Sequence, residues 1–175
     1  MGGATAEKIA EDFRAKLGGK VVSCEVRSYK RIYAEVAPKD FPEVALYLWG
    51  DRKARFNIAS GAQTPGGFEV LYHFSLNEGD ERGVGAGDGV VFSVRIRTSE
   101  KEHPVLPSVA GKIKAFSFIE RELHDLLGIA FDGHPDMKPL LRAEDWPEGF
   151  YPLRRTEKRA ELDVGSKRGT GESGS

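Results

Sequence analysis

Cysteine is nearly absent from this sequence, because Cys24 is the only one among 175 residues. A single thiol cannot close a disulfide within the chain, and it cannot supply the ligand set of an iron–sulfur cluster. We therefore expect Cys24 to be a buried, unreactive strand residue. We also expect this chain to hold no cysteine-ligated iron–sulfur cluster.

Long hydrophobic runs are also missing. The longest apolar run extends from Val44 to Trp49, whereas a membrane-spanning helix needs about 20 residues. Residues 1–6 lack the basic and apolar regions of a secretory signal, and Ala6 breaks the myristoylation pattern. Association with a membrane is therefore expected to come through partner proteins, and a plain cytosolic protein is the alternative.

Neither sign of charge dominates, since 26 basic and 27 acidic residues leave a net charge of -1. This balance provides no general electrostatic attraction for nucleic acid or anionic lipid. Side-chain amides are scarce, occurring only at Asn57, Gln63 and Asn77, while 30% of the residues are charged. That combination is typical of proteins from thermophiles.

The hydrophobic periodicity predicts an α+β fold, a mostly antiparallel sheet covered by two or three helices. The expected helices cover residues 5–17, 41–50 and 113–127, and the expected strands cover residues 21–27, 31–37, 54–59, 68–76 and 90–98. Residues 77–89 read as a loop. We divide the chain into an α+β domain (1–129), an irregular, extended arm that binds a partner (130–155) and a tail that is flexible or ordered by a partner (156–175).

The third expected helix has an apolar face and a clear stop signal. Phe116, Ile119, Leu123 and Leu126 recur at helical spacing, which predicts that they share the buried face. Gly128 follows the last of them and is able to adopt the left-handed conformation that ends a helix. The residues beyond it are rich in proline, tryptophan and arginine.

No catalytic motif is present. The glycines at 83, 85, 87 and 89 do not match the dinucleotide-binding spacing, and a strand follows them instead of a helix. Glu120 and His124 lie four residues apart on the expected helix, so a small metal-dependent enzyme built on Glu120, His124 and His134 is one alternative. An interaction domain unrelated to electron transfer is another.

One ordered set of motifs fills much of the C-terminal part. It comprises E-R-E at 120–122, D-L-L-G-I at 125–129, G-H-P-D at 133–136, Trp146 and P-L-R at 152–154. In order and spacing this segment resembles the family of the C subunit of NADH:quinone oxidoreductase, which is the 30 kDa subunit of complex I. The family includes counterparts in archaeal membrane-bound hydrogenase and sulfane sulfur reductase complexes.

The resemblance implies a non-catalytic subunit in the peripheral arm of a membrane-bound, ion-translocating oxidoreductase that carries out electron transport. Such a subunit packs on a [NiFe]-hydrogenase-like large subunit beside an iron–sulfur small subunit, on the cytoplasmic side of the cell membrane. The partners hold the cofactors, which are iron–sulfur clusters and, in hydrogenases, a NiFe centre, and no activity is expected from this chain alone. His124, Leu127 and Arg155 depart from the complex I pattern. Together with the composition they favour a hydrogenase or sulfur reductase of a thermophilic archaeon, with a quinone-reducing complex I as the alternative.

The physical chemistry of the segment also favours an interface. Arg121 and Asp125 lie one helical turn apart, but an exposed pair of this kind contributes only about 0.3–0.5 kcal/mol. Prolines stiffen the arm, and tryptophan, tyrosine and arginine dominate interface hot spots. A solvated polar face is the plainer interpretation of the helix charges. The expected partner-binding residues are Glu120, Arg121, Glu122, Asp125, His134, Pro135, Asp136, Trp146, Tyr151, Pro152, Leu153, Arg154 and Arg155.

Overall fold

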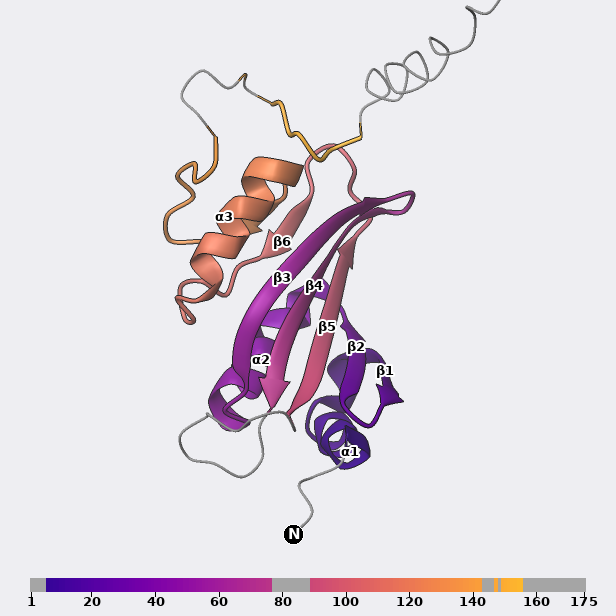
Figure 1. Cartoon of the computed structure of the whole chain (residues 1–175). Helices are drawn as coiled ribbons and strands as arrows, with labels where there is room; N and C mark the ends of the chain where they lie inside the picture. The colour runs from indigo at the N-terminus through magenta and orange to yellow at the C-terminus, as the bar shows by residue number, and fades with distance from the viewer. Residues whose placement is uncertain (1–5, 77–88, 143–146, 148, 156–175) are drawn as a thin grey trace, which may run out of the picture.

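The computed structural model describes residues 6–76, 89–142, 147 and 149–155. These residues form a five-stranded sheet in the order β1-β2-β5-β4-β3 and a two-stranded sheet, β6-β7 (Figure 1). The strands are β1 (Val21–Ser28), β2 (Arg31–Val36), β3 (Arg55–Thr64), β4 (Gly67–Leu76), β5 (Val90–Thr98), β6 (Val105–Pro107) and β7 (Ala130–Asp132). The helices are α1 (Ala6–Leu17), α2 (Phe41–Leu46) and α3 (Phe116–Leu127).

The larger sheet is mostly antiparallel, as the sequence predicts. β1 pairs with β2, β5 with β4 and β4 with β3 in antiparallel fashion, whereas β2 and β5 run parallel. The parallel pair arises because α2 and the β3–β4 hairpin intervene in the chain between these two strands. The α+β prediction is confirmed.

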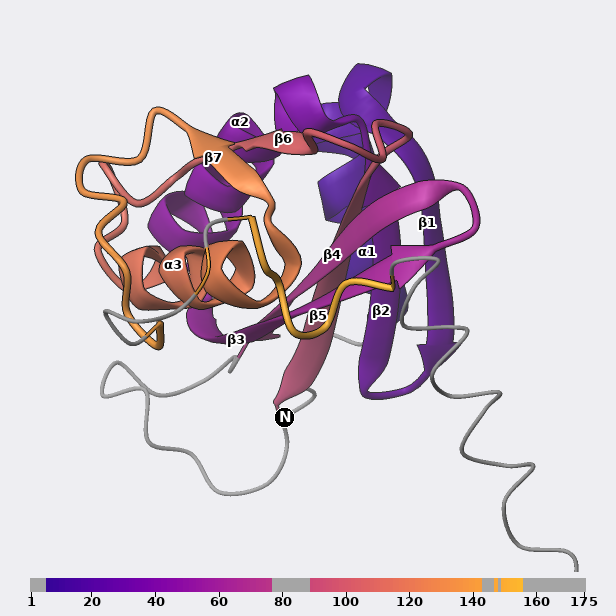
Figure 2. The same cartoon turned by 90° about the horizontal axis from the view of Figure 1, so that it is seen from above.

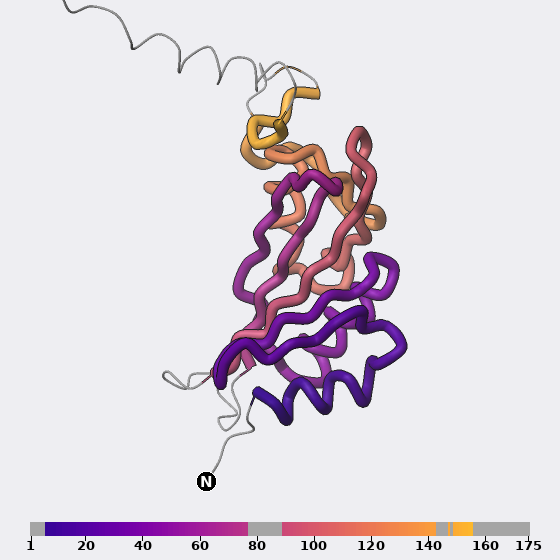
Figure 3. The backbone as a smooth tube through the Cα atoms, turned by 90° about the vertical axis from the view of Figure 1, so that its right-hand side faces the viewer, coloured from indigo at the N-terminus to yellow at the C-terminus, as the bar shows by residue number. Residues whose placement is uncertain are grey.

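All three helices cover the same face of the sheet, seen from above in Figure 2. Aromatic contacts establish this arrangement: the ring of Phe13 on α1 packs on Phe92 at 4.6 Å, and that of Phe41 on α2 stacks on Tyr72 at 4.2 Å. The ring of Phe116 on α3 stacks on Phe56 at 4.0 Å. Since side chains alternate along a strand, the opposite face carries the other half of each strand's residues. Figure 3 shows the five strands side by side, with α1 and the C-terminal segment at opposite ends of the sheet.

The strand and helix predictions differ from the structure mainly at their ends. The first helix and the strand at 90–98 are close to prediction, and Ile9, Phe13 and Leu17 are buried on α1. α2 is shorter than expected because the chain continues after Leu46 as one turn of π-helix. β3 is longer than expected, since a tight turn before Gly67 lets it pair with β4 along its whole length.

Three expectations are wrong in detail. β7 is a strand where the sequence indicates only irregular chain, and it pairs in parallel with β6. α3 starts at Phe116 rather than at residue 113, and it buries Glu120 and Leu127 where Ile119 and Leu126 were expected to be buried. Cys24 is half-buried because β1 is an edge strand, and this partial burial raises the pKa of its thiol. The loop and tail predicted at 77–89 and 156–175 lie almost entirely outside the described residues.

Within the part of the chain that the structure describes, none of the helices has the length and apolar character needed to span a bilayer.

Candidate partner-binding surface

Helix α3 ends at Gly128, and two features of this position require a glycine. Gly128 has φ of 72°, the left-handed conformation predicted from the sequence, and its N–H donates to the carbonyl of His124 at 2.8 Å. A Cβ at this position would also lie 2.6–2.8 Å from ring atoms of Tyr151. The close approach of Tyr151 brings the end of the arm onto the end of the helix, where the N–H of Leu153 donates to the carbonyl of Leu126 at 3.0 Å.

Two charged residues of α3 hold the middle of the arm. The Asp125 carboxylate is buried and accepts backbone N–H bonds from Leu140 (2.7 Å), Leu141 (2.7 Å) and Arg142 (3.3 Å). Although burial by itself raises the pKa of Asp125, these three N–H donors outweigh it, so the net pKa of the carboxyl is lowered.

Arg121 is the second of these residues and lies one turn earlier on the helix. Its guanidinium donates to the carbonyl oxygens of Lys138 at 2.7 Å and Pro139 at 3.0 Å. Arg121 and Asp125 thus bind neighbouring stretches of the arm, where the sequence suggested that they pair with each other. The two residues, which we call the clamp, determine the path of residues 138–142.

Glu120 is fully buried between α3 and the segment after β6. Its carboxylate accepts from the Ser108 hydroxyl at 2.5 Å and from the backbone N–H of Val109 at 3.1 Å. Burial raises the pKa of Glu120 to about 7, even though both hydrogen bonds act to lower it. The buried hydroxyl of Tyr72 has no hydrogen-bond partner among the described residues, and burial followed by the charge of Glu120 raises its pKa well above 10.

His134 and His124 each have a ring nitrogen within hydrogen-bonding distance of the backbone. His134 is buried, with Nε2 at 3.2 Å from the Ser117 carbonyl and Nδ1 accepting from the N–H of Asp136 at 3.0 Å. Nδ1 of His124 lies 3.0 Å from the carbonyl of Ile129. His134 Nε2 is 4.0 Å from the Glu120 carboxylate. Among the described residues, no group of three His, Cys, Asp or Glu side chains is arranged to hold a metal ion, so the alternative metal enzyme gains no support.

The last described residues fasten the arm to the large sheet. The Arg154 guanidinium donates to the carbonyl oxygens of Lys101 and of Glu102 (2.6 Å) in the β5–β6 connection, and it lies 5.2 Å from the centre of the Phe68 ring. The backbone N–H of Arg155 donates to Gln63 Oε1 at 2.6 Å, at the end of β3. The described parts of the arm are therefore attached to the domain at residues 138–142 and again at 153–155.

The other expected interface residues have more open positions. Glu122 and Pro152 are half-buried, whereas Pro135, Asp136, Leu153 and Arg155 are exposed. Trp146 lies outside the described residues. Glu120 and Asp125 are both enclosed by the chain itself: Glu120 holds the segment after β6, and Asp125 holds the arm. Their contact with a partner, like that of the exposed residues, stays a prediction.

Several important residues were missed from the sequence. Ser108 and Gln63 hold the site through hydrogen bonds between distant segments, which no local pattern reveals. Glu120 was expected at an interface, and its burial within the chain could have been predicted, because its spacing to Phe116 and Leu123 places it on the buried face of α3. Exposed apolar side chains at Phe118, Leu141 and Phe150 were also missed.

Comparison with known proteins agrees with the motif order. The family model described as "Respiratory-chain NADH dehydrogenase, 30 Kd subunit" matches residues 34–161. The C subunit of NADH-quinone oxidoreductase from Jannaschia sp. (strain CCS1) is 30% identical over 155 residues, which cover 85% of this chain and 69% of that protein. The chloroplastic J subunit of NAD(P)H-quinone oxidoreductase from Angiopteris evecta is 32% identical over 123 residues, 69% of this chain and 73% of that protein.

Two solved structures share the fold. The trypsin-resistant fragment (1-134) of Nqo5 superposes with a TM-score of 0.57 at 28% identity, covering 74% of this chain and 97% of that fragment. A chain of the membrane-bound sulfane sulfur reductase, an archaeal respiratory membrane complex, gives a TM-score of 0.67 at 20% identity, over 97% of this chain and 95% of that one. The second likeness shows the fold alone. Since the family match spans most of the chain, including α3 and the arm, this protein belongs to the family of the 30 kDa subunit of respiratory-chain NADH dehydrogenase, the C subunit of NADH-quinone oxidoreductase.

Proposed function

We propose that the chain is a non-catalytic subunit in the peripheral arm of a membrane-bound, ion-translocating oxidoreductase complex. In this proposal it packs on the [NiFe]-hydrogenase-like large subunit through α3 and the C-terminal arm and stabilises it, beside the iron–sulfur small subunit. The cofactors belong to these partners, and the subunit is held on the cytoplasmic side of the cell membrane by them.

The observation that carries this proposal is a set of apolar side chains exposed on α3 and the arm. Phe118 is 64% exposed, Leu153 57%, Leu141 51% and Phe150 49%. Large apolar groups exposed on one helix and on the segment that follows it favour a protein interface. Arg121 adds a guanidinium 5.8 Å from the Phe118 ring, which is a pairing typical of interface hot spots.

The hydrogen bonds of the arm support the same role. Asp125 and Arg121 bind the backbone of the arm, and Arg154 attaches the arm to the β5–β6 connection, while apolar side chains of the arm remain outside the core. A segment that is ordered before binding loses less conformational entropy when a partner covers it. This arrangement fits a preformed docking surface better than a solvated polar face.

Two kinds of complex are candidates. The composition and the departures at His124 and Leu127 favour a hydrogenase or sulfur reductase of a thermophilic archaeon. The 30% identity with the Jannaschia protein over 155 residues favours a quinone-reducing complex I. Identification of the large subunit that co-purifies with this chain, and of the cysteines around its metal centre, separates the two.

The proposal is tested by co-purification of the tagged chain from its native membranes. We expect the large subunit to accompany the wild type, and the double variant Phe118→Ser/Leu153→Ser to recover about tenfold less of it, a loss of about 1.4 kcal/mol of binding. Val22→Ser is the matched control, because Val22 is 66% exposed on β1, at the other edge of the sheet. Equal recovery with both variants, or a complex that is intact without this chain, would refute the proposal.

A further inference from the structure

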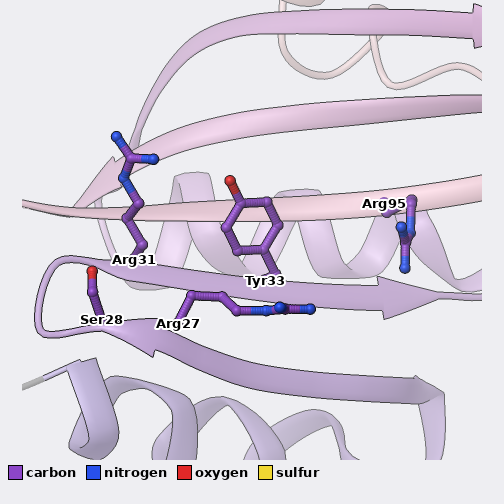
Figure 4. Close-up of a pocket in the computed structure, with 5 residues that line it drawn as sticks. All are labelled: Arg27, Ser28, Arg31, Tyr33 and Arg95. Carbon is purple, nitrogen blue, oxygen red and sulfur yellow. The ribbon is translucent and has the colours of Figure 1, made fainter.

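A polar pocket lies on the face of the sheet that the described helices leave open. It has a volume of about 620 Å³ and is lined by Arg27, Ser28, Arg31, Tyr33 and Arg95. Figure 4 shows these side chains in front of the strands, with the helices behind. They come from β1, β2 and β5, which are adjacent in the sheet, so the pocket is built on regular, hydrogen-bonded backbone.

All polar side chains that line this pocket are able to donate hydrogen bonds. Three of the lining residues carry guanidinium groups and two carry hydroxyls, and no carboxylate is among them. Arg27 uses its Nη2 for Glu25 at 2.7 Å, and Arg95 uses its Nη2 for Glu35 at 2.8 Å. A guanidinium has five N–H donors, so each of the two retains others.

Two donors in the pocket stand out. Arg31 is exposed and forms no ion pair with another described residue. The Nε of Arg95 is buried and has no hydrogen-bond partner within the described part of the chain. Buried donors are normally satisfied, so an unpaired one beside a cavity indicates a missing acceptor.

We infer that this pocket binds the phosphate group of a small phosphorylated molecule, with Arg31 as the main contact. A carboxylate is satisfied by one guanidinium in a forked pair, whereas three guanidinium groups spread along one pocket (Figure 4) suit an anion with several negative charges and several acceptor oxygens. The volume lies within the range of small-molecule sites and leaves room beside the phosphate for the rest of the molecule. Glu25 and Glu35 offset two of the three positive charges, so binding depends on direct hydrogen bonds and weakens as salt rises.

This inference does not depend on the proposed role in assembly, and its test uses the full chain alone. Inorganic pyrophosphate is titrated into the protein by calorimetry at constant ionic strength. Saturable binding of one equivalent is expected, with Arg31→Ala about tenfold weaker because a charge-assisted hydrogen bond is lost. Arg31→Lys should lie between the two, since it keeps the charge but loses the planar fork.

Arg55→Ala is the matched control, because Arg55 is an exposed arginine on β3, at the opposite edge of the same sheet. The affinity of the Arg55→Ala variant for pyrophosphate should stay within about twofold of wild type, since removal of a distant surface charge changes affinity by about that much. Ser28→Ala is a second variant that removes a hydroxyl without removing charge, and weaker binding of pyrophosphate is expected from it too.

The inference is overturned if the titration shows no saturable heat of binding or if Arg55→Ala loses as much affinity as Arg31→Ala. It is also overturned if a polyglutamate peptide binds the pocket more tightly than pyrophosphate, since the surface would then suit an acidic polypeptide.

Discussion

The body of the domain and the C-terminal arm are held by different forces. In the body, Phe41, Tyr72, Phe74 and Phe116 are buried together between the sheet and the helices. The path of the arm depends instead on hydrogen bonds between its backbone and a few side chains, above all the Asp125 carboxylate, which accepts from N–H groups of the arm. The body is thus stabilised mainly by apolar burial and the arm mainly by polar contacts.

This difference has a structural consequence. Apolar burial is non-directional, whereas a carboxylate that accepts three N–H bonds fixes the backbone in one conformation. By using its backbone for attachment, the arm keeps Leu141 and Leu153 available on its surface. Damage to the body should therefore affect the whole fold, while damage to the clamp should release the arm and leave the sheet intact.

The largest effect is expected from Phe116→Ala. This ring is fully buried and packs on Phe56 at 4.0 Å, so its removal leaves a cavity under the sheet. We expect a loss of about 4 kcal/mol in the free energy of unfolding, measured by urea denaturation. Phe118→Ala is the control, because Phe118 is exposed on the same helix, and it should change stability by less than about 0.5 kcal/mol. Similar losses in the two variants would show that α3 does not pack through Phe116.

Asp125→Ala should have the next largest effect, and a local one. Removal of the Asp125 carboxylate leaves three backbone N–H groups without their acceptor, which destabilises the attachment of the arm by about 3 kcal/mol. We expect faster amide hydrogen exchange at Leu140 and Leu141 and faster proteolysis of the arm, with exchange in β4 and β5 unchanged.

The control for this variant is Asp136→Ala, which removes an exposed carboxylate from the arm itself. It should leave the exchange rates of Leu140 and Leu141 as in the wild type. Continued protection of these amides in Asp125→Ala would mean that other contacts hold the arm, and the comparison between body and arm would fail.

Much of the fold could be predicted from the sequence because its signals are local. Alternating apolar residues predict β4 and β5 closely, and the spacing of Ile9, Phe13 and Leu17 predicts α1. β7 could not be predicted in this way. It is short and has only Phe131 buried, so its strand conformation depends on pairing with β6, which is distant in sequence.

The candidate site also has parts that could be predicted from local sequence signals and parts that could not. The motif order identified the family, and Gly128 could be predicted as a helix cap from the conformational freedom of glycine. The clamp could not be predicted, because the contact between Asp125 and the N–H of Leu140 depends on how the arm turns back after Pro139. A charge at an i, i+4 position looks the same in sequence whether it binds a neighbour on the helix or a distant backbone.

Glu120 joins α3 to the segment after β6, and its ionisation gives the smallest of the three effects. In the folded protein the pKa of the Glu120 carboxyl is raised to about 7 by burial, against 4.5 for an ordinary glutamate carboxyl. Between these pH values only the unfolded chain is ionised, so stability falls as pH rises and stays low above 7. One pKa unit corresponds to about 1.4 kcal/mol, which sets an upper limit of about 3 kcal/mol on the loss of stability, and we expect a loss of about 2 kcal/mol between pH 5 and pH 8.

Glu120→Gln tests this prediction, because the variant has no carboxyl to ionise at this position. The difference in unfolding free energy between Glu120→Gln and the wild type should therefore change across that pH range. For the control Glu122→Gln, the same difference should stay constant. A constant difference for Glu120→Gln from pH 5 to pH 8 would show that the buried carboxylate is already charged at pH 5, held by Ser108 and Val109 alone.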